Sequence, residues 1–454
     1  MHVLFIAMEF PPLNVAGVYR PMRFLNSLVE KGITPVVLTF AVDDNFKKNH
    51  RNFDEQLLNQ LDPRIIIERI PMQDISMLHR TKLKSFLNIY FNATDNYLKA
   101  WKENFYKAIP GIIKKYSPTA IITTCPPFSS AVLAKNLSVE YKLPLIVDMR
   151  DAWSEWAIVP FGSYFHYLNR KNEERKVFEQ ADAIISVTPQ LLNKFKAAHP
   201  SVNKNKFHLI YNTSTTENYS DEVILLKPID GEKVIKIGYS GSFYYQEEAR
   251  KSIFTPWWKK RGHKMLQYTP VKEDWLYRSP YFFLQAFSGL LKKRKEWEGK
   301  IEFHYNGEIT DWLLKMITET GLKNSVKLNG FLSKKEVEQK EQEYDLLLTT
   351  SEKVIGGEHF CLPSKLFSYL KSAKPIIGFV TPGIQKDFLQ QCGIGIAFDP
   401  DAMDTAVNQL EQLFTEGYTG RLNKTYLNTF SNKNATGLFC NIVSAVTKHP
   451  QTEL

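Results

Sequence analysis

Short apolar runs alternate with longer amphipathic stretches along almost the whole chain. Runs such as His2 to Met8 and Tyr344 to Thr350 are typical of strands that are buried on both faces of a parallel sheet. The stretches between such runs, for example Val18 to Glu30 and Tyr281 to Lys293, repeat apolar residues at helical spacing. Strands that alternate with helices in this way predict βαβ units and a doubly wound α/β fold.

The pattern predicts two sheets, one in each half of the chain. The predicted strands are 2–8, 34–40, 65–70, 119–124, 144–148, 181–187 and 207–212 in the first half, and 234–239, 301–305, 325–328, 344–350, 375–380 and 394–398 in the second. A chain of 454 residues also exceeds the roughly 100–200 residues of an ordinary domain. We therefore predict two domains, at 1–215 and 233–430, joined by a polar linker.

Two segments do not fit the regular alternation. Residues 246–277 interrupt the second domain and are interpreted as an insertion. They carry Trp257 and Trp258 beside the basic run 259–261, which suits a membrane interface or a lipid-linked acceptor. The same residues equally suit a partner contact or a small flap over a site. The aromatic and basic stretch from Leu83 to Ile113, which includes Phe86, suits either a bilayer interface or a helix packed on the core.

Composition narrows the class of protein. The four cysteines, Cys125, Cys361, Cys392 and Cys440, lie far apart, which matches neither a disulfide framework nor a zinc site and suits a reducing cytosol. No signal peptide and no apolar run of about 20 residues is evident. The formal charge of +10 favours an anionic membrane or a phosphorylated substrate, beside a merely lysine-rich surface, because no nucleic-acid-binding motif accompanies it.

One loop in the second domain has the pattern of an anion site. After the strand that ends at Thr350 come a glycine pair at 356–357, the acid Glu358, and a helix start at Ser364 and Lys365. Backbone N–H groups and the positive end of the helix dipole converge at such a point, and Lys365 adds a full charge. The alternative is an ordinary strand-to-helix turn with a solvated lysine.

This loop and a second segment resemble a known family. Leu362 to Phe367 with Tyr369 resembles the donor-sugar loop of GT-B glycosyltransferases of the glycosyltransferase family 4, or group 1, type. The segment from Thr123 to Trp153, which contains Asp148, Arg150 and Asp151, resembles another motif of that family. The resemblance covers nearly the whole chain in the right order. It departs at Ser368, where the family has its second acid, and at Gly17, which stands alone where the family has two glycines.

The resemblance implies a fold, an activity and a location. The fold would be GT-B, with two Rossmann-like doubly wound domains facing across a cleft and a C-terminal helix, within 431–454, that crosses back to the first domain. The activity would be transfer of a sugar from a nucleotide-diphosphate sugar to a glycan or lipid-linked acceptor, in bacterial surface polysaccharide synthesis. We expect no other cofactor, no metal, no nucleic-acid partner, and retention rather than inversion. The expected location is the cytoplasm, with the inner face of the plasma membrane as a further alternative.

The resemblance also implies roles for individual residues. Glu358 would be catalytic, and Asp151 would act as a general base if the enzyme inverts. Gly17 and Arg150 would face the acceptor, although Asp148 and Arg150 could equally form an ion pair that shapes the loop. The expected donor-binding residues are Gly241, Ser242, Arg278, Asn306, Gly330, Phe331, Leu332, Ser364, Lys365, Leu366 and Ser368.

Two other functions are weighed against this one. A non-catalytic scaffold or binding subunit on the same fold would explain the departures at Ser368 and Gly17. A nucleotide-sugar 2-epimerase would need further acids and histidines around the sugar, and the pattern does not place them. The oligomeric state is left open.

Overall fold

The chain folds into two compact units. The computed structural model describes residues 1–44, 47, 52–73, 87, 90–91, 96–155, 160–214, 219, 221–231 and 233–448. The first unit contains Met1–Thr213, Trp257–Pro270 and Asn432–Leu454, and the second contains Ser214–Pro256 and Val271–Ser431. Phe86, most of the aromatic stretch before residue 96 and parts of the predicted linker lie outside the described residues.

The sheet of the first unit has seven parallel strands in the order β3-β2-β1-β4-β5-β6-β7. They are β1 (His2–Ile6), β2 (Thr34–Phe40), β3 (Ile66–Ile70), β4 (Ile121–Cys125), β5 (Leu145–Met149), β6 (Ala183–Ser186) and β7 (Phe207–Leu209). Each lies within or next to a strand that the apolar runs predict. Val3, Phe5 and Ile122 are fully buried, as expected for a parallel sheet that helices cover on both faces.

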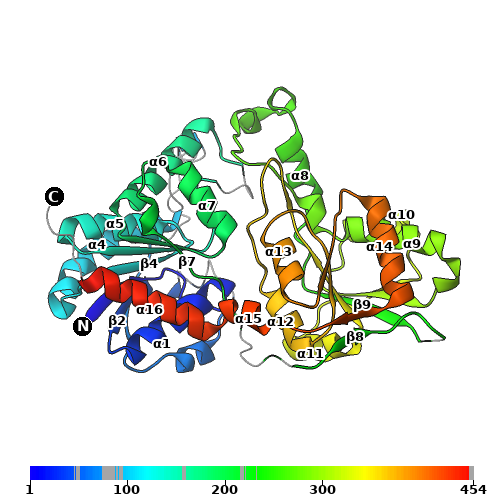
Figure 1. The fold of residues 1–454 in the computed structure, drawn as a ribbon. Helices are drawn as coiled ribbons and strands as arrows, with labels where there is room; N and C mark the ends of the chain where they lie inside the picture. The colour runs from blue at the N-terminus through cyan, green and yellow to red at the C-terminus, as the bar shows by residue number, and fades with distance from the viewer. Residues whose placement is uncertain are drawn as a thin grey trace. The chain divides into compact units, whose positions relative to one another are not determined.

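Helices connect these strands and cover the sheet (Figure 1). They are α1 (Tyr19–Glu30), α4 (Asn96–Tyr116), α5 (Ser129–Tyr141), α6 (Tyr164–Gln180) and α7 (Pro189–Ala198). Helix α6 begins at Tyr164. Its start is fixed by Ser163, whose Oγ accepts the His166 N–H at 3.0 Å and so caps the first turn.

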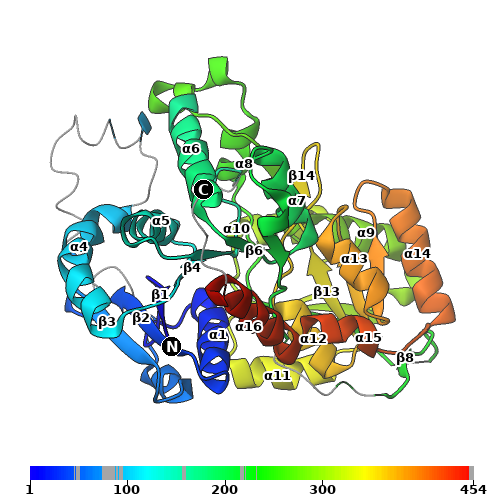
Figure 2. The same cartoon turned by 60° about the vertical axis from the view of Figure 1, so that its left-hand side comes forward.

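The last helix of the chain belongs to the first unit. The helix predicted at 432–448 is α16 (Asn432–Lys448), and it lies beside α1 in both views (Figures 1 and 2). Phe439 stacks on Phe24 of α1 with ring centroids 4.0 Å apart, and Cys440 Sγ lies 3.4 Å from Ser27 Oγ. Both phenylalanines are almost fully buried, so α16 completes the core on this side of the sheet.

The sheet of the second unit has six parallel strands in the order β12-β11-β9-β13-β15-β16. They are β9 (Ile235–Ser240), β11 (Ile301–Asn306), β12 (Val326–Leu328), β13 (Leu346–Thr350), β15 (Ile376–Phe379) and β16 (Gly395–Phe398). Strands β11 and β12 are added in turn on one side of β9, and β13, β15 and β16 are then added in turn on its other side. The strand order therefore reverses between β9 and β13, as it does between β1 and β4 in the first unit.

The helices of the second unit follow its strands closely. They are α9 (Tyr281–Lys293), α10 (Asp311–Glu319), α11 (Lys334–Glu343), α12 (Lys365–Ser372), α13 (Ile384–Gln391), α14 (Met403–Glu416) and α15 (Lys424–Leu427). Helix α11 begins with a capping box: Ser333 N–H donates to Glu336 Oε2 at 2.7 Å, and Glu336 N–H donates to Ser333 Oγ at 3.4 Å. No helix within the described residues is long and apolar enough to cross a membrane.

The predicted insertion at 246–277 is divided between the two units. Its ends, α8 (Glu247–Phe254) and β10 (Glu273–Asp274), belong to the second unit, where β10 pairs with β14 (Lys353–Val354). Its middle, Trp257–Pro270, belongs to the first unit. Phe161 N–H donates to Tyr268 O at 2.8 Å, and Tyr268 N–H donates to Phe161 O at 3.0 Å. The segment Trp257–Pro270 thus interrupts the sequence of the second unit, and backbone pairing ties it to the first unit.

Candidate functional site

The carboxyl ends of β9 and β13 carry the most concentrated polar chemistry of the second unit. Ser240 ends β9 and is followed by Gly241 and Ser242, and Thr350 ends β13 and is followed by Ser351. These two strands flank the reversal of strand order. Open α/β sheets bind ligands in the crevice at such a reversal, so this edge is the candidate site.

The turn after β9 is held by the neighbouring strand β11. Gly241 N–H donates to Asn306 O at 2.8 Å, and Gly241 has φ of +109°, which favours glycine. The buried Asn306 amide donates to Ser240 Oγ at 3.1 Å and accepts from Asn329 Nδ2 at 2.7 Å. Asn306 is therefore buried and shapes the turn, and its contact with the donor, which the resemblance implies, stays a prediction.

Lys365, the first residue of α12, brings a cation to this turn. Its Nζ lies 3.7 Å from the centroid of the Tyr239 ring, and a Cβ placed on Gly241 would lie 3.5 Å from the same Nζ. Burial lowers the pKa of Lys365 to about 7, and the nearby Arg278 adds to this effect while Glu341 opposes it. Within the described part of the chain, Lys365 forms no ion pair.

Arg278 is the second cation of the site. It ends the 3-10 turn Trp275–Arg278, and its backbone oxygen accepts the Thr350 hydroxyl at 2.9 Å, which ties it to the end of β13. Its Nε lies 3.3 Å from Glu352 Oε2. Burial alone would lower the pKa of Arg278, but Glu352 together with Cys361, Glu273 and Tyr239 outweighs burial and raises it. Arg278 therefore remains charged in a largely buried position.

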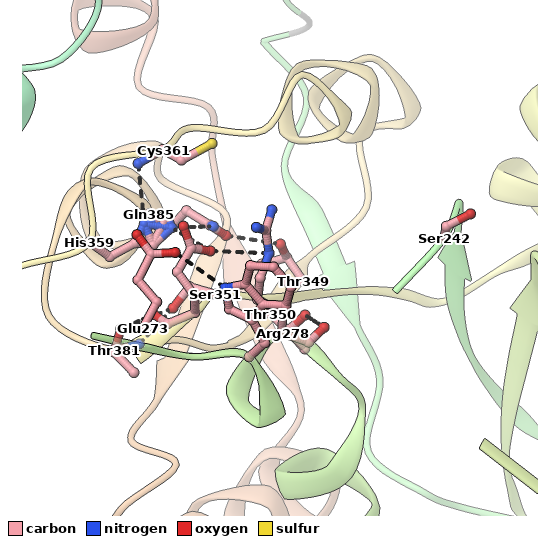
Figure 3. A network of polar contacts seen from close by, with 12 residues as sticks. Ser242, Glu273, Arg278, Thr349, Thr350, Ser351, His359, Cys361, Thr381 and Gln385 are labelled. Carbon is pink, nitrogen blue, oxygen red and sulfur yellow. Dashed lines mark hydrogen bonds and ion pairs between the residues drawn. The ribbon is translucent and has the colours of Figure 1, made fainter. Parts of the chain in front are cut away.

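A buried network holds Glu352 in place. His359 Nδ1 accepts the Cys361 N–H at 3.2 Å, so in the neutral ring the proton resides on Nε2, which lies 3.3 Å from Glu352 Oε2. Gln385 Nε2 also lies 3.1 Å from this ring nitrogen, which is a contact rather than a hydrogen bond in this tautomer because both nitrogens are donors, and Thr349 Oγ1 donates to Gln385 Oε1 at 3.2 Å. Figure 3 shows Arg278, His359 and Gln385 in this one network, with Ser242 apart from it.

The pKa shifts agree with an ionised Glu352 that lies between the charged Arg278 and the neutral imidazole of His359. Burial would raise the pKa of Glu352, but His359 and Arg278 lower it below its ordinary value. Burial lowers the pKa of His359, and Glu352 only partly offsets this. The sequence offered one signal for Glu352, an acid two residues beyond a predicted buried strand, and none for its pairing with His359.

The other residues expected to bind the donor are not part of the group formed by Gly241, Arg278 and Lys365. Glu358, Ser364 and Ser368 are exposed, and Ser368 Oγ donates to Lys365 O at 2.8 Å within the helix. The side chain of Leu366 is fully buried and its N–H donates to Pro363 O at 3.1 Å. Leu366 therefore has no evident way to contact a ligand, because both its side chain and its N–H are already engaged.

The turn after β12 presents a different surface. Gly330 has φ of +75°, Leu332 is half-buried, and the Phe331 side chain is 74% exposed. A ring this exposed is available for stacking, but no contact ties these residues to Lys365 or Arg278 among the described residues. The structure therefore brings together Gly241, Arg278 and Lys365, and leaves residues 330–332 at the next strand end.

The expected acceptor residues form a group of their own in the first unit. Gly17 and Arg150 approach each other closely: a Cβ on Gly17 would overlap the Arg150 guanidinium, which would then have to shift. Arg150 donates from Nε to Cys125 O at 3.2 Å and from Nη2 to Pro126 O. Burial raises the pKa of the Asp151 carboxyl, and Arg150 partly opposes this. These residues lie after β1, β4 and β5, at the strand reversal of the first sheet.

The alternative of an Asp148–Arg150 ion pair is wrong. Asp148 is fully buried and pairs instead with Arg20 of α1, with Arg20 Nη2 2.8 Å from Asp148 Oδ1. Thr124 Oγ1 donates to Asp148 Oδ2 at 2.9 Å, and Arg20 Nη1 donates to Tyr211 O at 2.9 Å. Arg20 lies on the first turn of α1 and reaches Asp148 at the end of β5, whereas Arg150 points to the turn after β4.

Comparison with solved structures identifies the architecture. The chain matches sucrose-phosphate synthase from Thermosynechococcus elongatus over 99% of its length and 96% of that chain, at 12% identity and a TM-score of 0.53. It matches the lipopolysaccharide outer core galactosyltransferase WaaB over 98% and 99%, at 14% identity and a TM-score of 0.55. It matches HepE of Anabaena in complex with UDP over 99% and 98%, at 12% identity and a TM-score of 0.51.

The chain has the GT-B fold. Its two parallel sheets of seven and six strands are the two Rossmann-like domains of that fold. No protein-family model matches the sequence, and no curated protein matches it in sequence. Assignment to glycosyltransferase family 4 therefore stays a prediction, while the expected GT-B architecture is confirmed.

Proposed function

We propose that this GT-B protein is a glycosyltransferase that binds a nucleotide-diphosphate sugar in its second domain. The observation that supports this most directly is the pair of cations, Lys365 and Arg278, beside the Gly241 turn at the strand reversal. Lys365 forms no ion pair among the described residues, and burial and Arg278 lower its pKa although the Glu341 carboxylate opposes them. A diphosphate supplies the negative charge that this arrangement lacks.

The proposed reaction uses that charge at the leaving group. The bond between the anomeric carbon and the diphosphate oxygen breaks, and its electron pair stays on the diphosphate. An acceptor hydroxyl forms the new bond to the anomeric carbon, and its proton passes to the departing diphosphate. Lys365 and Arg278 stabilise the charge that develops on the diphosphate, and they do so without reorganisation because both are held in place before the reaction.

The roles of the two candidate catalytic acids stay proposals. Glu358 is exposed on the loop between β14 and α12, where it would contact sugar hydroxyls or the developing positive charge. Asp151 has a raised pKa owing to burial, which suits a general base if the reaction inverts. We propose retention, with Asp151 then on the acceptor side together with Gly17 and Arg150. Metal independence and a cytoplasmic location stay predictions.

The substrates are proposed at the level of class. HepE was solved with UDP, and WaaB is a galactosyltransferase of the lipopolysaccharide outer core. These relatives support a nucleotide-sugar donor and a glycan or lipid-linked acceptor, as in bacterial surface polysaccharide synthesis.

Donor binding is tested by thermal shift and calorimetry with a panel of nucleoside diphosphates and their sugars. At 100 times Kd, a ligand stabilises the folded state by about 2.7 kcal/mol. We expect one nucleotide series to do so for the wild type and to do so far less for Lys365→Met. Lys371→Met is the matched control: Lys371 lies on the same helix, is exposed, and its Nζ lies 3.9 Å from Glu338.

The result separates the enzyme from a scaffold. Stabilisation by a nucleotide sugar that Lys365→Met loses and Lys371→Met keeps would support the donor site, and release of the nucleoside diphosphate with an acceptor extract would then establish transfer. If no nucleotide stabilises the protein, or if Lys365→Met binds as the wild type does, the proposed donor site is wrong and the non-catalytic scaffold becomes the better explanation.

A further inference from the structure

One surface of the first unit exposes large apolar side chains. Trp257 and Trp258 are 63% and 65% exposed, and Met265 and Leu266 on the following turn are exposed as well. Tyr164 and Phe165, on the first turn of α6, are also exposed. We call these six residues, together with the exposed basic residues Lys259, Arg261 and Lys264, the aromatic–basic surface. Single exposed apolar residues are normal on a protein surface, but a group of this kind marks an interaction site.

Tyr268 joins the two parts of this surface. It pairs with Phe161 through two backbone hydrogen bonds of 2.8 and 3.0 Å, just before α6 begins. Its ring lies 4.9 Å from the Tyr164 ring and 4.8 Å from the Tyr167 ring, measured between centroids. Figure 2 shows the turns of the segment Trp257–Pro270 beside one tip of α6. The tryptophans are therefore presented by a segment that is fixed to the first unit rather than by a loose loop.

The surface is positively charged. The segment Trp257–Pro270 contains Lys259, Lys260, Arg261 and Lys264 and no Asp or Glu. Lys259, Arg261 and Lys264 are exposed. Their ammonium and guanidinium groups thus lie in the same short segment as the exposed tryptophans.

We propose that the aromatic–basic surface docks on an anionic lipid bilayer. Tryptophan and tyrosine are favoured at the level of lipid headgroups, where the ring is apolar and its N–H or O–H remains hydrated. Basic residues beside them are attracted to anionic lipids. A protein partner fits less well, because the buried centre of protein interfaces is depleted of lysine. Charge complementarity therefore selects the membrane as the occupant.

Docking of this kind deepens the proposed function, because it would bring the first domain to a lipid-linked acceptor. The donor site is in the second unit and shares no residue with the aromatic–basic surface. Vesicle binding can be measured without any nucleotide, so failure of the membrane proposal and failure of the donor proposal are distinguishable.

The apolar part of the surface is tested by co-sedimentation of the full chain with vesicles of pure phosphatidylcholine and of phosphatidylcholine with 30% phosphatidylglycerol. We expect the wild type to bind the anionic vesicles only. The double variant Trp257→Ser with Trp258→Ser should bind these vesicles at least about tenfold more weakly, because it no longer buries two aromatic side chains in the bilayer interface. Both side chains are largely exposed, so the variant is expected to fold, and its circular dichroism and Tm check this. Leu225→Ser, at an exposed position of the second unit, is the control.

The charged part is tested with matched double variants. Lys259→Gln with Lys264→Gln should weaken binding to anionic vesicles about 30-fold, which corresponds to about 1 kcal/mol for each lysine near an anionic surface. Lys204→Gln with Lys323→Gln removes the same charge from exposed positions elsewhere and should leave binding within about twofold. Binding of the wild type should also fall as salt is raised, because exposed charges are screened.

Three outcomes would overturn the proposal. The first is a wild-type protein that does not bind anionic vesicles. The second is a tryptophan variant that folds and binds vesicles as the wild type does. The third is concentration-dependent self-association in analytical ultracentrifugation that the tryptophan variant abolishes, with no vesicle binding by the wild type, which would assign the surface to a contact between copies of the chain.

Discussion

Lys365 makes donor affinity depend on pH in a direction that the structure determines. In the ligand-free protein, burial and Arg278 lower the pKa of Lys365 to about 7, so the ammonium is present below pH 7 and lost above it. A bound diphosphate favours the charged form and raises this pKa. Above pH 7 binding must therefore be accompanied by proton uptake, and the affinity for a nucleotide sugar should fall as pH rises.

The size of the effect follows from the same shift. A pH of 9 is about two units above the pKa of Lys365 in the ligand-free protein, so protonating its amine takes about 2.7 kcal/mol. Binding should therefore be about 100-fold weaker at pH 9 than at pH 6. The full effect requires that the bound pKa stays above 9. A charge pair at 4 Å provides about 4 kcal/mol at the effective dielectric near a protein surface, which is enough to keep the bound ammonium protonated.

Isothermal titration calorimetry from pH 6 to pH 9 measures both the affinity and the proton uptake on binding. The ligand should be a nucleotide sugar, because a terminal phosphate titrates near pH 6 whereas the internal diphosphate of a nucleotide sugar keeps its charge. Repeating each titration in two buffers of different ionisation enthalpy gives the proton uptake, which we expect to approach one above pH 8. Lys365→Arg should bind without this pH dependence, since arginine stays charged.

The reasoning is refuted by either of two results. One is a wild-type affinity that changes less than about threefold between pH 6 and pH 9, because a pKa near 7 requires a larger change. The other is a Lys365→Arg variant with the same slope as the wild type, which would assign the titration to a different group.

Three further predictions follow from the same domain. Lys365→Met should raise the stability of the ligand-free protein at pH 6 by on the order of 3 kcal/mol, because the lowered pKa of Lys365 means a burial cost that is full below pH 7 and fades as pH rises towards 10.5; equal urea midpoints at pH 6 would contradict it. Glu352→Gln should lower the free energy of unfolding by about 3–5 kcal/mol, since it leaves the buried Arg278 without its counter-charge, and a urea midpoint within error of the wild type would disprove this. Phe331→Ala should leave stability within about 0.5 kcal/mol, because the ring is 74% exposed, yet weaken nucleotide binding at least tenfold if a base stacks on it; unchanged calorimetric affinity would remove Phe331 from the site.

Most of the fold was predictable because its elements are local. The strand predicted at Thr34 to Phe40 and the helix predicted at Tyr281 to Lys293 have the predicted bounds in the structure. Apolar runs and helical spacing are properties of neighbouring residues, so a sequence read alone displays them. The division of the segment 246–277 was not predictable, because it depends on the pairing of Tyr268 with Phe161, which are far apart in the sequence.

The site was predictable only where local rules apply. Lys365 and Gly241 follow from strand, turn and helix start, and the structure brings them together. The network around Glu352 depends on Arg278 and His359, which approach it from separate segments, and no spacing rule links them. The mistaken pairing of Asp148 had the same cause: a neighbour in sequence was preferred to an arginine on a distant helix.

The charges of the site indicate what kind of ligand it accepts. Glu352 neutralises Arg278 and is itself held by His359, so this pair is balanced. Lys365 forms no ion pair among the described residues: burial and Arg278 lower its pKa, and the Glu341 carboxylate offsets this only in part. A neutral sugar or a nucleoside brings no charge and cannot offset the remainder, whereas a diphosphate can. The order of stabilisation should therefore be nucleotide sugar and nucleoside diphosphate well above nucleoside and free sugar. If the nucleoside alone stabilised the protein as much as its diphosphate, the unpaired lysine would not be the feature that binds the donor.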